Sequence, residues 1–375
     1  MKKVFLFFVF LSFCFGGEFE DFKNSNAKQL NDFSSEFDIY QKAYLKEFSN
    51  YTKAIAKNFG KAQTSSEHIW VGYDDKFLSK KSIDFKNAQL NFEVVANDEK
   101  EAKEKIAKLL DEIAKETTKT ALDNNSLEKN LRQKLNIKTN DISSQPLVFD
   151  AFSPNQIEAE KSKLKEAKLQ KSTFHKNQIF KLNIKLPDDF TVKKAKTYSP
   201  LVHKFAIKYG LAPELVFAII HTESYFNPMA KSPAPAFGLM QIVPKSAGSD
   251  VAKNLGHDQS KITPEFLYDG ENNILYGTTY LNLLNTKYLS KISNQKSKLY
   301  CAISAYNGGA SNVARAFEKT TKIDEAAPKI DALSSDEVYE RLIASLPFLE
   351  TREYLFRVNE RFEMYKKLLE DGQLR

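Results

Sequence analysis

Residues 213 to 228 read PELVFAIIHTESYFNP, and this stretch predicts the helix around which the rest of the chain is organised. Pro213 and Glu214 suit a first helical turn, because proline loses no hydrogen bond there and an acidic side chain interacts favourably with the helix dipole. The helix is expected to stop at Asn227-Pro228, since the residue before a proline is disfavoured in the α region.

Glu223 is the candidate functional residue of this helix. Val216, Ile219 and Ile220 precede it at spacings that place all four side chains on one helical face. A carboxyl on an apolar face is desolvated, which raises its pKa toward the range that a general acid requires near neutral pH. The alternative is a buried Glu paired with Lys or Arg, and the helix alone does not separate the two.

The N-terminus has the form of an export signal. Lys2 and Lys3 precede a short apolar segment, residues 4–15, and the small Gly16 and Gly17 offer a cleavage point, so residues 1–17 are expected to be a signal peptide that directs the chain to the periplasm. The segment is too short to predict a spanning helix.

A second interpretation of the same segment is a lipoprotein signal, Leu11-Ser12-Phe13-Cys14, which would attach Cys14 to the outer membrane. Phe13 is bulky where such signals have a small residue. The other cysteine, Cys301, then has no partner for a disulfide and is expected to be a small buried hydrophobic residue.

Composition limits the function without naming it. A chain of 375 residues, 42% of them hydrophobic, is long enough for two domains with their own cores. The net charge of +7 is too small to identify a partner. Nucleic-acid binding is not predicted, because basic residues form no stripe with interleaved aromatics. The five histidines show no ligand spacing, so no metal and no cofactor are predicted.

Residues 18–190 are predicted to form a mixed α/β accessory domain. Periodicity predicts strands near residues 69–71, 82–85, 89–94, 146–149 and 178–186, the last of which is expected to close the sheet. Helices are predicted over 18–60, from residue 97 with a face that includes Ile106 and Thr117, and over 156–169, with polar linkage across 123–145. Trp70 is interpreted as core or interface packing rather than as a platform for a sugar.

Residues 195–375 are predicted to form a mainly α-helical domain, so the fold class is α+β. Ser199-Pro200 is expected to cap a helix that ends at Gly210, and Gly277 to permit close helix packing. Residues 232–235 are too rich in proline for a helix. Further helices are predicted over 274–284, 297–305, 312–317, 336–346 and 352–368.

Four short segments of this second part share the residue types of a binding site. They are Glu223-Ser224, Gly238-Leu239-Met240-Gln241, Ala305-Tyr306-Asn307-Gly308-Gly309 and Glu350-Thr351-Arg352-Glu353-Tyr354. Glycine lets the backbone approach a ligand, and Gln241 offers both a donor and an acceptor. Singly each segment is weak, because Tyr306 and Tyr354 are more often core aromatics.

In this order the segments resemble the lytic transglycosylase family with the goose-type lysozyme fold. The resemblance covers residues 198 to 368 and includes Ser232 and the helix with Asn273, Gly277 and Tyr280. Trp70 and its neighbours also make residues 69–95 and 179–187 similar to the accessory domain of the membrane-bound lytic murein transglycosylase C type. Pro233 and Pro235 depart from the pattern.

The resemblance implies cleavage of the β-1,4 bond between N-acetylmuramic acid and N-acetylglucosamine in peptidoglycan, without water. It implies that Glu223 is both acid and base, and that Tyr354 hydrogen-bonds and orients it. It further implies that Tyr306 lines the reactive subsite, and that Ser232, Met240, Gln241 and Asn307 contact the saccharide or shape the cleft.

Two other functions stay open from the sequence. Ordinary glycosidases need two carboxylates, and the motif segments nearest to Glu223 are expected to supply no second one; a hydrolytic muramidase would need such a group across the cleft. A non-catalytic peptidoglycan-binding protein would have no need for a desolvated acid.

Overall fold

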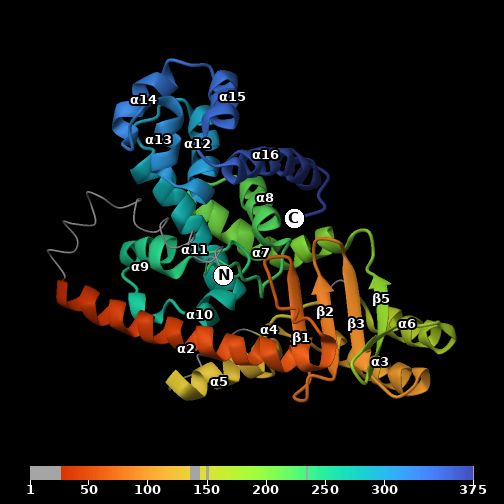
Figure 1. Cartoon of the computed structure of the whole chain (residues 1–375). Coiled ribbons are helices and arrows are strands. Elements are labelled where there is room, and N and C mark those ends of the chain that lie inside the picture. The colour runs from red at the N-terminus through yellow and green to blue at the C-terminus, as the bar shows by residue number, and fades with distance from the viewer. Residues whose placement is uncertain (1–26, 136–143, 149–151, 234, 375) are drawn as a thin grey trace.

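The computed structural model describes residues 27–135, 144–148, 152–233 and 235–374, with side chains from Lys42 onward (Figure 1). The predicted signal peptide and Cys14 lie outside the described residues. The first part of the chain combines a sheet with helices, and from residue 190 onward the regular elements are helices. The predicted α+β class is confirmed.

The sheet has five antiparallel strands in the order β1-β2-β3-β5-β4. They are β1 (Ile69–Tyr73), β2 (Ser79–Asp84), β3 (Gln89–Val95), β4 (Gln170–Phe174) and β5 (Asn177–Lys185). The predicted hairpin is confirmed, with Ile83 opposite Leu90 and alternate β3 residues buried. The expectation that residues 178–186 close the sheet is wrong, because β4 pairs outside β5. Most β4 side chains are exposed and polar, so this strand lacks the alternation that reveals the others.

Five described helices belong to the first part: α2 (Ala27–Phe59), α3 (Glu99–Ala114), α4 (Thr118–Asp123), α5 (Ser126–Leu135) and α6 (Pro154–Glu166). α3 packs against β2, β3 and β5 through the predicted apolar face, but Thr117 caps α4 instead of belonging to that face. The prediction of a polar linker across residues 123–145 is wrong for residues 126–135, which form α5. The strand predicted at 146–149 is wrong for the described residues 146–148: Pro146 makes an isolated bridge to Thr117, and Leu147 is buried. Residue 149 lies outside the described residues.

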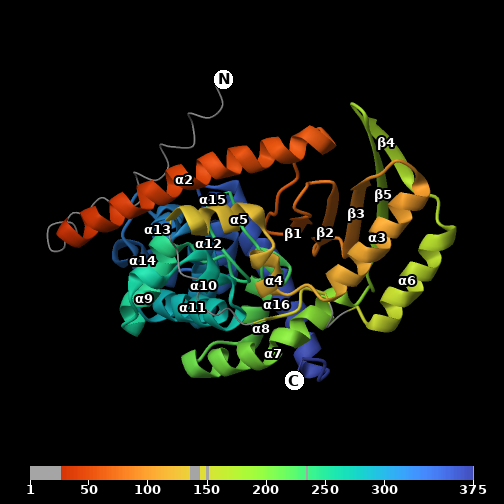
Figure 2. The same ribbon diagram turned by 90° about the horizontal axis from the view of Figure 1, so that it is seen from below.

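The second part consists of helices α7 (Phe190–Tyr209), α8 (Pro213–Ser224), α9 (Ser249–Leu255), α10 (Pro264–Tyr268), α11 (Gly270–Leu283), α12 (Gln295–Gly308), α13 (Ala310–Phe317), α14 (Ile323–Asp331), α15 (Ser335–Ser345) and α16 (Leu349–Glu370), with short turns at Pro244–Gly248, Gln259–Lys261 and Leu284–Tyr288. In both views α2 extends from the α9 and α10 region to the sheet, so it borders both parts (Figures 1 and 2).

α7 begins ten residues earlier than Ser199-Pro200 predicts. Pro200 lies inside the helix, where a proline costs about 3 kcal/mol. The buried Phe190 and Tyr198 offset that cost by packing in the core. Ser199 donates its hydroxyl to the Leu374 carbonyl at 2.6 Å, so it binds the C-terminus instead of capping a helix. Gly210 ends α7 in the left-handed conformation, as predicted.

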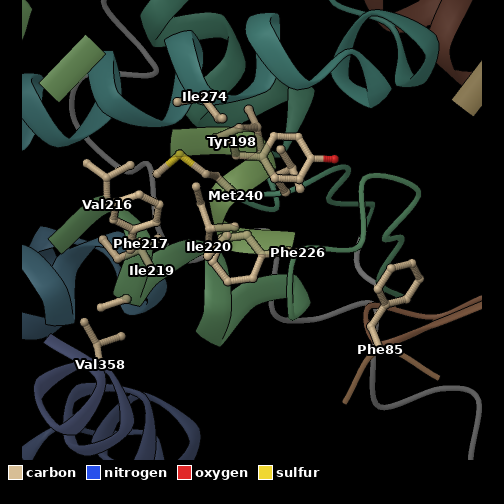
Figure 3. Packing of buried hydrophobic residues seen from close by; sticks show 14 of the residues in the cluster. Phe85, Tyr198, Val216, Phe217, Ile219, Ile220, Phe226, Met240, Ile274 and Val358 are labelled. Carbon is tan, nitrogen blue, oxygen red and sulfur yellow. The ribbon is translucent and has the colours of Figure 1, made fainter. Parts of the chain in front are cut away.

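The hydrophobic core is continuous from the sheet to α16, and α8 lies at its centre (Figure 3). Residues 215–220 are all buried, so α8 is covered on every side rather than along one stripe. Because Phe85 of the first part and Tyr198 of α7 belong to the same cluster, the predicted division into residues 18–190 and 195–375 stays a prediction. Cys301 is buried among these residues, as expected.

Candidate active site

Glu223 lies in the last turn of α8, next to the end of the buried segment. Tyr354, which enters from α16, donates its hydroxyl to Oε1 of Glu223 at 2.7 Å. The Tyr354 side chain is only 2% exposed, and α8 and α16 pack closely along their length. The hydrogen bond that the resemblance implied is therefore present, and the core holds its donor in place.

The surroundings raise the pKa of Glu223 to about 8. Burial is the main cause, because the apolar neighbours disfavour the charged carboxylate. The Tyr354 hydrogen bond opposes this shift, while the charges of Glu350 and Glu67 add to it and that of Arg357 lowers the pKa. With a pKa of about 8 the carboxyl is protonated near neutral pH. Glu223 is only partly buried, so the group is also accessible to a ligand.

The Gly-Leu-Met-Gln loop supports the site from within the core. A Cβ atom at Gly238 would lie 2.2 Å from the Leu267 carbonyl oxygen, so glycine is required here by neighbouring backbone rather than by a ligand. Met240 is fully buried, and its side chain fills the space that Gly277 leaves on α11. The expectation that Gly277 permits close helix packing is wrong, because its close neighbour is this loop.

Gln241 adopts a left-handed conformation, with φ at 48°. Its Nε2 donates to the Gly238 carbonyl at 2.9 Å, and its Oε1 is buried without a hydrogen-bond partner. A buried acceptor without a partner is costly. The loop is thus fixed, with one amide oxygen left to accept a hydrogen bond.

Tyr306 and Asn307 form the end of α12 beside this loop. Tyr306 donates its hydroxyl to the Met240 carbonyl at 2.8 Å and contacts Tyr280 edge-on. Burial raises the pKa of Tyr306 well above its usual value, and the nearby charge of Glu223 adds to the shift. Asn307 accepts a hydrogen bond from Thr351 of α16 at 2.8 Å. The structure therefore brings Glu223, Tyr354, Tyr306 and the 238–241 loop together.

Ser232 lies in a loop attached to the first part of the chain. Its backbone N–H donates to the Ala236 carbonyl at 3.1 Å, which closes the proline-containing turn. The preceding Lys231 lies 3.9 Å from a Glu128 carboxylate oxygen of α5 and 4.1 Å from the ring centroid of Tyr44 of α2. The loop position thus depends on helices far away in the sequence.

Sequence reasoning missed the charged groups around Glu223. Glu67 precedes β1 and Glu350 lies in the first turn of α16, and both carboxylates raise the pKa of Glu223. Glu350 corrects the expectation that the motif segments nearest to Glu223 supply no second carboxylate. Glu67 is half-buried and Glu350 exposed. Glu350 belongs to a motif segment and could have been noticed, whereas nothing in the local sequence around Glu67 points to the site. Among the described residues, no group of three or more His, Cys, Asp or Glu side chains could hold a metal ion.

A match to a protein-family model identifies the class of enzyme to which this site belongs. Residues 200–327 match the model of the transglycosylase SLT domain. The SLT match, the helical fold and the single hydrogen-bonded carboxyl together define a transglycosylase-domain enzyme.

Full-length relatives identify the family. The chain is 33% identical over 345 residues to membrane-bound lytic murein transglycosylase C of Pectobacterium atrosepticum, covering 86% of this chain and 92% of that protein. The Cronobacter sakazakii protein of that name is 31% identical over 352 residues, 88% of this chain and 92% of that protein. This chain belongs to the membrane-bound lytic murein transglycosylase C family.

Solved structures add a more distant likeness. The 70 kDa soluble lytic transglycosylase from Escherichia coli is 17% identical, with a TM-score of 0.36 over 72% of this chain and 44% of that chain.

Proposed function

We propose that the protein is a peptidoglycan lytic transglycosylase that cleaves the bond between N-acetylmuramic acid and N-acetylglucosamine without water. The observation that carries the proposal is the hydrogen bond from Tyr354 to a carboxyl, Glu223, that is protonated near neutral pH. Membership of a family whose relatives are named lytic murein transglycosylases supports the substrate class.

The reaction requires one carboxyl that acts twice. Glu223 donates its proton to the glycosidic oxygen as the bond to C1 breaks, and the N-acetyl oxygen of the muramic acid stabilises the positive charge that develops at C1. The Glu223 carboxylate then removes the proton of the 6-hydroxyl, whose oxygen attacks C1. The products are a 1,6-anhydromuramic acid end and a free 4-hydroxyl on N-acetylglucosamine, and Glu223 is protonated again.

Tyr354 fits a role as the orienting partner throughout this cycle. Its hydroxyl donates to Oε1 of Glu223, which stabilises the carboxylate that forms after the first proton transfer. The other oxygen of Glu223 stays available for the substrate. In this proposal Tyr306, Asn307, Ser232 and Gln241 contact the saccharide, and the buried Met240 fixes the loop that carries Gln241.

We further propose that the protein is exported and acts in the cell envelope. The basic and apolar character of residues 1–17 supports an export signal, and relatives named membrane-bound support attachment, for which Cys14 is the candidate. In the described part of the chain, no helix is both long and apolar enough to cross a membrane.

The test is to digest purified peptidoglycan sacculi with the mature protein and identify the fragments by mass spectrometry. Wild type should release muropeptides with anhydro ends, and Glu223→Gln should release none, because glutamine cannot transfer a proton. Glu214→Gln, at the other end of α8, is the matched control and should act as wild type. Activity retained by Glu223→Gln would contradict the proposed site.

A hydrolytic muramidase is the second candidate, because Glu67 and Glu350 place further negative charge near Glu223. A second carboxylate could activate water for attack at C1. Digestion in water enriched in ¹⁸O separates the two reactions. Hydrolysis adds the label to reducing ends, whereas the proposed reaction gives unlabelled anhydro ends.

A further inference from the structure

The end of α8 has an unusual backbone. Tyr225 and Phe226, which directly follow Glu223-Ser224, both have positive φ angles, 52° and 62°. For residues other than glycine this conformation costs about 1 kcal/mol or more each, so surrounding contacts must stabilise it. The Tyr225 N–H donates to the His221 carbonyl at 3.2 Å. The turn that carries Glu223 therefore depends on what contacts these two side chains.

Phe226 is held by the core, whereas Tyr225 is held by three polar side chains. Phe226 is fully buried and stacks on Tyr198. Arg361 of α16 donates from Nη2 to the Tyr225 hydroxyl at 2.7 Å, and its guanidinium carbon lies 4.8 Å from the ring centroid. The rings of His221 and His68 meet the Tyr225 ring edge-on, with centroids 4.7 and 4.9 Å away. We call His68, His221, Tyr225 and Arg361 the Tyr225 cluster.

His68 brings the first part of the chain into this cluster. Its carbonyl accepts a hydrogen bond from the Phe85 N–H at 2.9 Å, which fixes it to the sheet beside β1. The backbone carbonyl of the neighbouring Glu67 accepts a hydrogen bond from the side-chain amide of Asn227 at 3.2 Å. The Ser66 carbonyl accepts a 3.4 Å bond from the Lys231 N–H. Residues 66–68 are thus attached to both the end of α8 and the loop with Ser232.

We propose that His68 and Arg361 are positioning residues for the reaction: through Tyr225 they hold the last turn of α8 so that Glu223 keeps its orientation toward Tyr354. The inference rests on the proposed function of Glu223. It assigns a role to the segment before β1, which would support the active site with a residue from the first part of the chain. A helix end without such contacts frays, and a carboxyl on a frayed turn loses its alignment.

His68 acts by shape rather than by charge. Burial lowers the pKa of His68 to about 4, and the charges of Lys86, Arg361 and Arg357 act in the same direction against that of Asp84. The imidazole is therefore neutral near pH 7, and a phenyl ring could take its place against Tyr225. The charged groups that influence Glu223 itself are Glu350, Arg357 and Glu67, and none of them is changed by a substitution at His68.

The experiment compares His68→Ala with His68→Phe in the full mature protein acting on isolated peptidoglycan. His68→Ala should lower kcat about tenfold with KM within about twofold of wild type, and His68→Phe should restore most of the rate. His175→Ala removes an imidazole from the exposed β4–β5 turn of the same sheet and should act as wild type. Tyr225→Phe, which removes only the hydroxyl bound by Arg361, should lower kcat about threefold.

The pH profile separates positioning from general stability. Activity should fall above the pKa of Glu223, because the acid must be protonated. In His68→Ala this fall should begin at lower pH, since a loosened turn admits water and the pKa of Glu223 decreases. An unchanged kcat and profile in His68→Ala, or an equal loss in His68→Phe, would overturn the proposal.

Hydrogen exchange tests the same contact without using activity. Amides of residues 224–226 should exchange about tenfold faster in His68→Ala than in wild type, and at the wild-type rate in His175→Ala. Unchanged exchange in His68→Ala would overturn the positioning role. If wild type releases no anhydro product, the proposed function fails, and the exchange rates still decide whether the Tyr225 cluster stabilises the turn.

Discussion

α7 and α8 both end on a residue in the left-handed conformation, but the two ends are stabilised by different means. Gly210 ends α7 with φ at 63°, and a Cβ atom at this position would meet nothing within 4 Å. Tyr225 ends α8 with φ at 52° and contacts His68, His221 and Arg361. Glycine adopts this conformation without strain, whereas tyrosine needs external contacts.

The strained backbone is at the helix end that carries the candidate functional residue, Glu223. The α7 end is encoded by one residue and could be predicted from Gly210 alone. The α8 end combines a strained turn with a carboxyl, and its contacts come from α16 and from the segment before β1. Strained backbone that the surrounding structure stabilises is frequent at active sites.

The largest expected effect is on the free energy of unfolding as a function of pH, through Glu223 at the α8 end. The pKa of Glu223 is about 8 in the folded protein and about 4.5 without its surroundings. The folded state therefore binds the proton more tightly. The stabilising contribution is complete below pH 4.5 and is lost as pH rises toward 8, by on the order of a few kcal/mol.

Urea denaturation of wild type and Glu223→Gln at pH 5 and pH 8 measures this contribution. Glutamine does not titrate, so the free energy of unfolding of the variant should change less between the two pH values. Glu214→Gln, at the start of α8, should keep the wild-type dependence. Identical pH dependence in wild type and Glu223→Gln would contradict the raised pKa.

A smaller effect is expected when Tyr354→Phe removes the hydrogen bond to Glu223. The carboxylate loses its donor, so kcat should fall by about 10- to 100-fold. The hydrogen bond lowers the pKa of Glu223, and its loss raises that pKa further. The upper limit of the pH profile should therefore move to higher pH, opposite to the shift expected for His68→Ala.

Tyr339→Phe, in α15, is the matched control for this prediction and should leave the pH profile unchanged. A profile of Tyr354→Phe that moves to lower pH would show that water, and not the tyrosine hydroxyl, sets the protonation of Glu223.

The smallest expected effect is at the α7 end. Gly210→Ala places a Cβ in the left-handed conformation without any clash, so the free energy of unfolding should decrease by about 1 kcal/mol and kcat should not change. Gly256→Ala, at the similar end of α9, should behave in the same way. Tyr225→Gly should instead lower kcat although it removes strain, because the contacts of the ring are lost. A loss of kcat in Gly210→Ala equal to that in Tyr225→Gly would remove the distinction between the two helix ends.

The predictions from the sequence succeeded where a local pattern carried the information. Polar and apolar residues alternate strictly along β3, which forms a hairpin with β2, and the apolar face of α3 recurs at helical spacing, so both features were found. β4 and α5 were missed because their residues are mostly polar, and tertiary contacts stabilise them. Pro200 was misplaced because the core packing of Phe190 and Tyr198 outweighs the cost of a proline inside a helix.

By itself the sequence determined the α+β class, the α8 helix and Glu223 as the candidate acid, because apolar spacing and motif order are local properties. Tertiary structure alone decided the protonation of Glu223, since the pKa of a carboxyl depends on desolvation and on charges such as Glu67 and Arg357 that arrive from other elements. It also decided that α8 stops at Ser224 and not at Asn227-Pro228. Contacts with His68 and Arg361, 157 and 136 residues away from Tyr225 in the sequence, stabilise a turn that tyrosine does not favour.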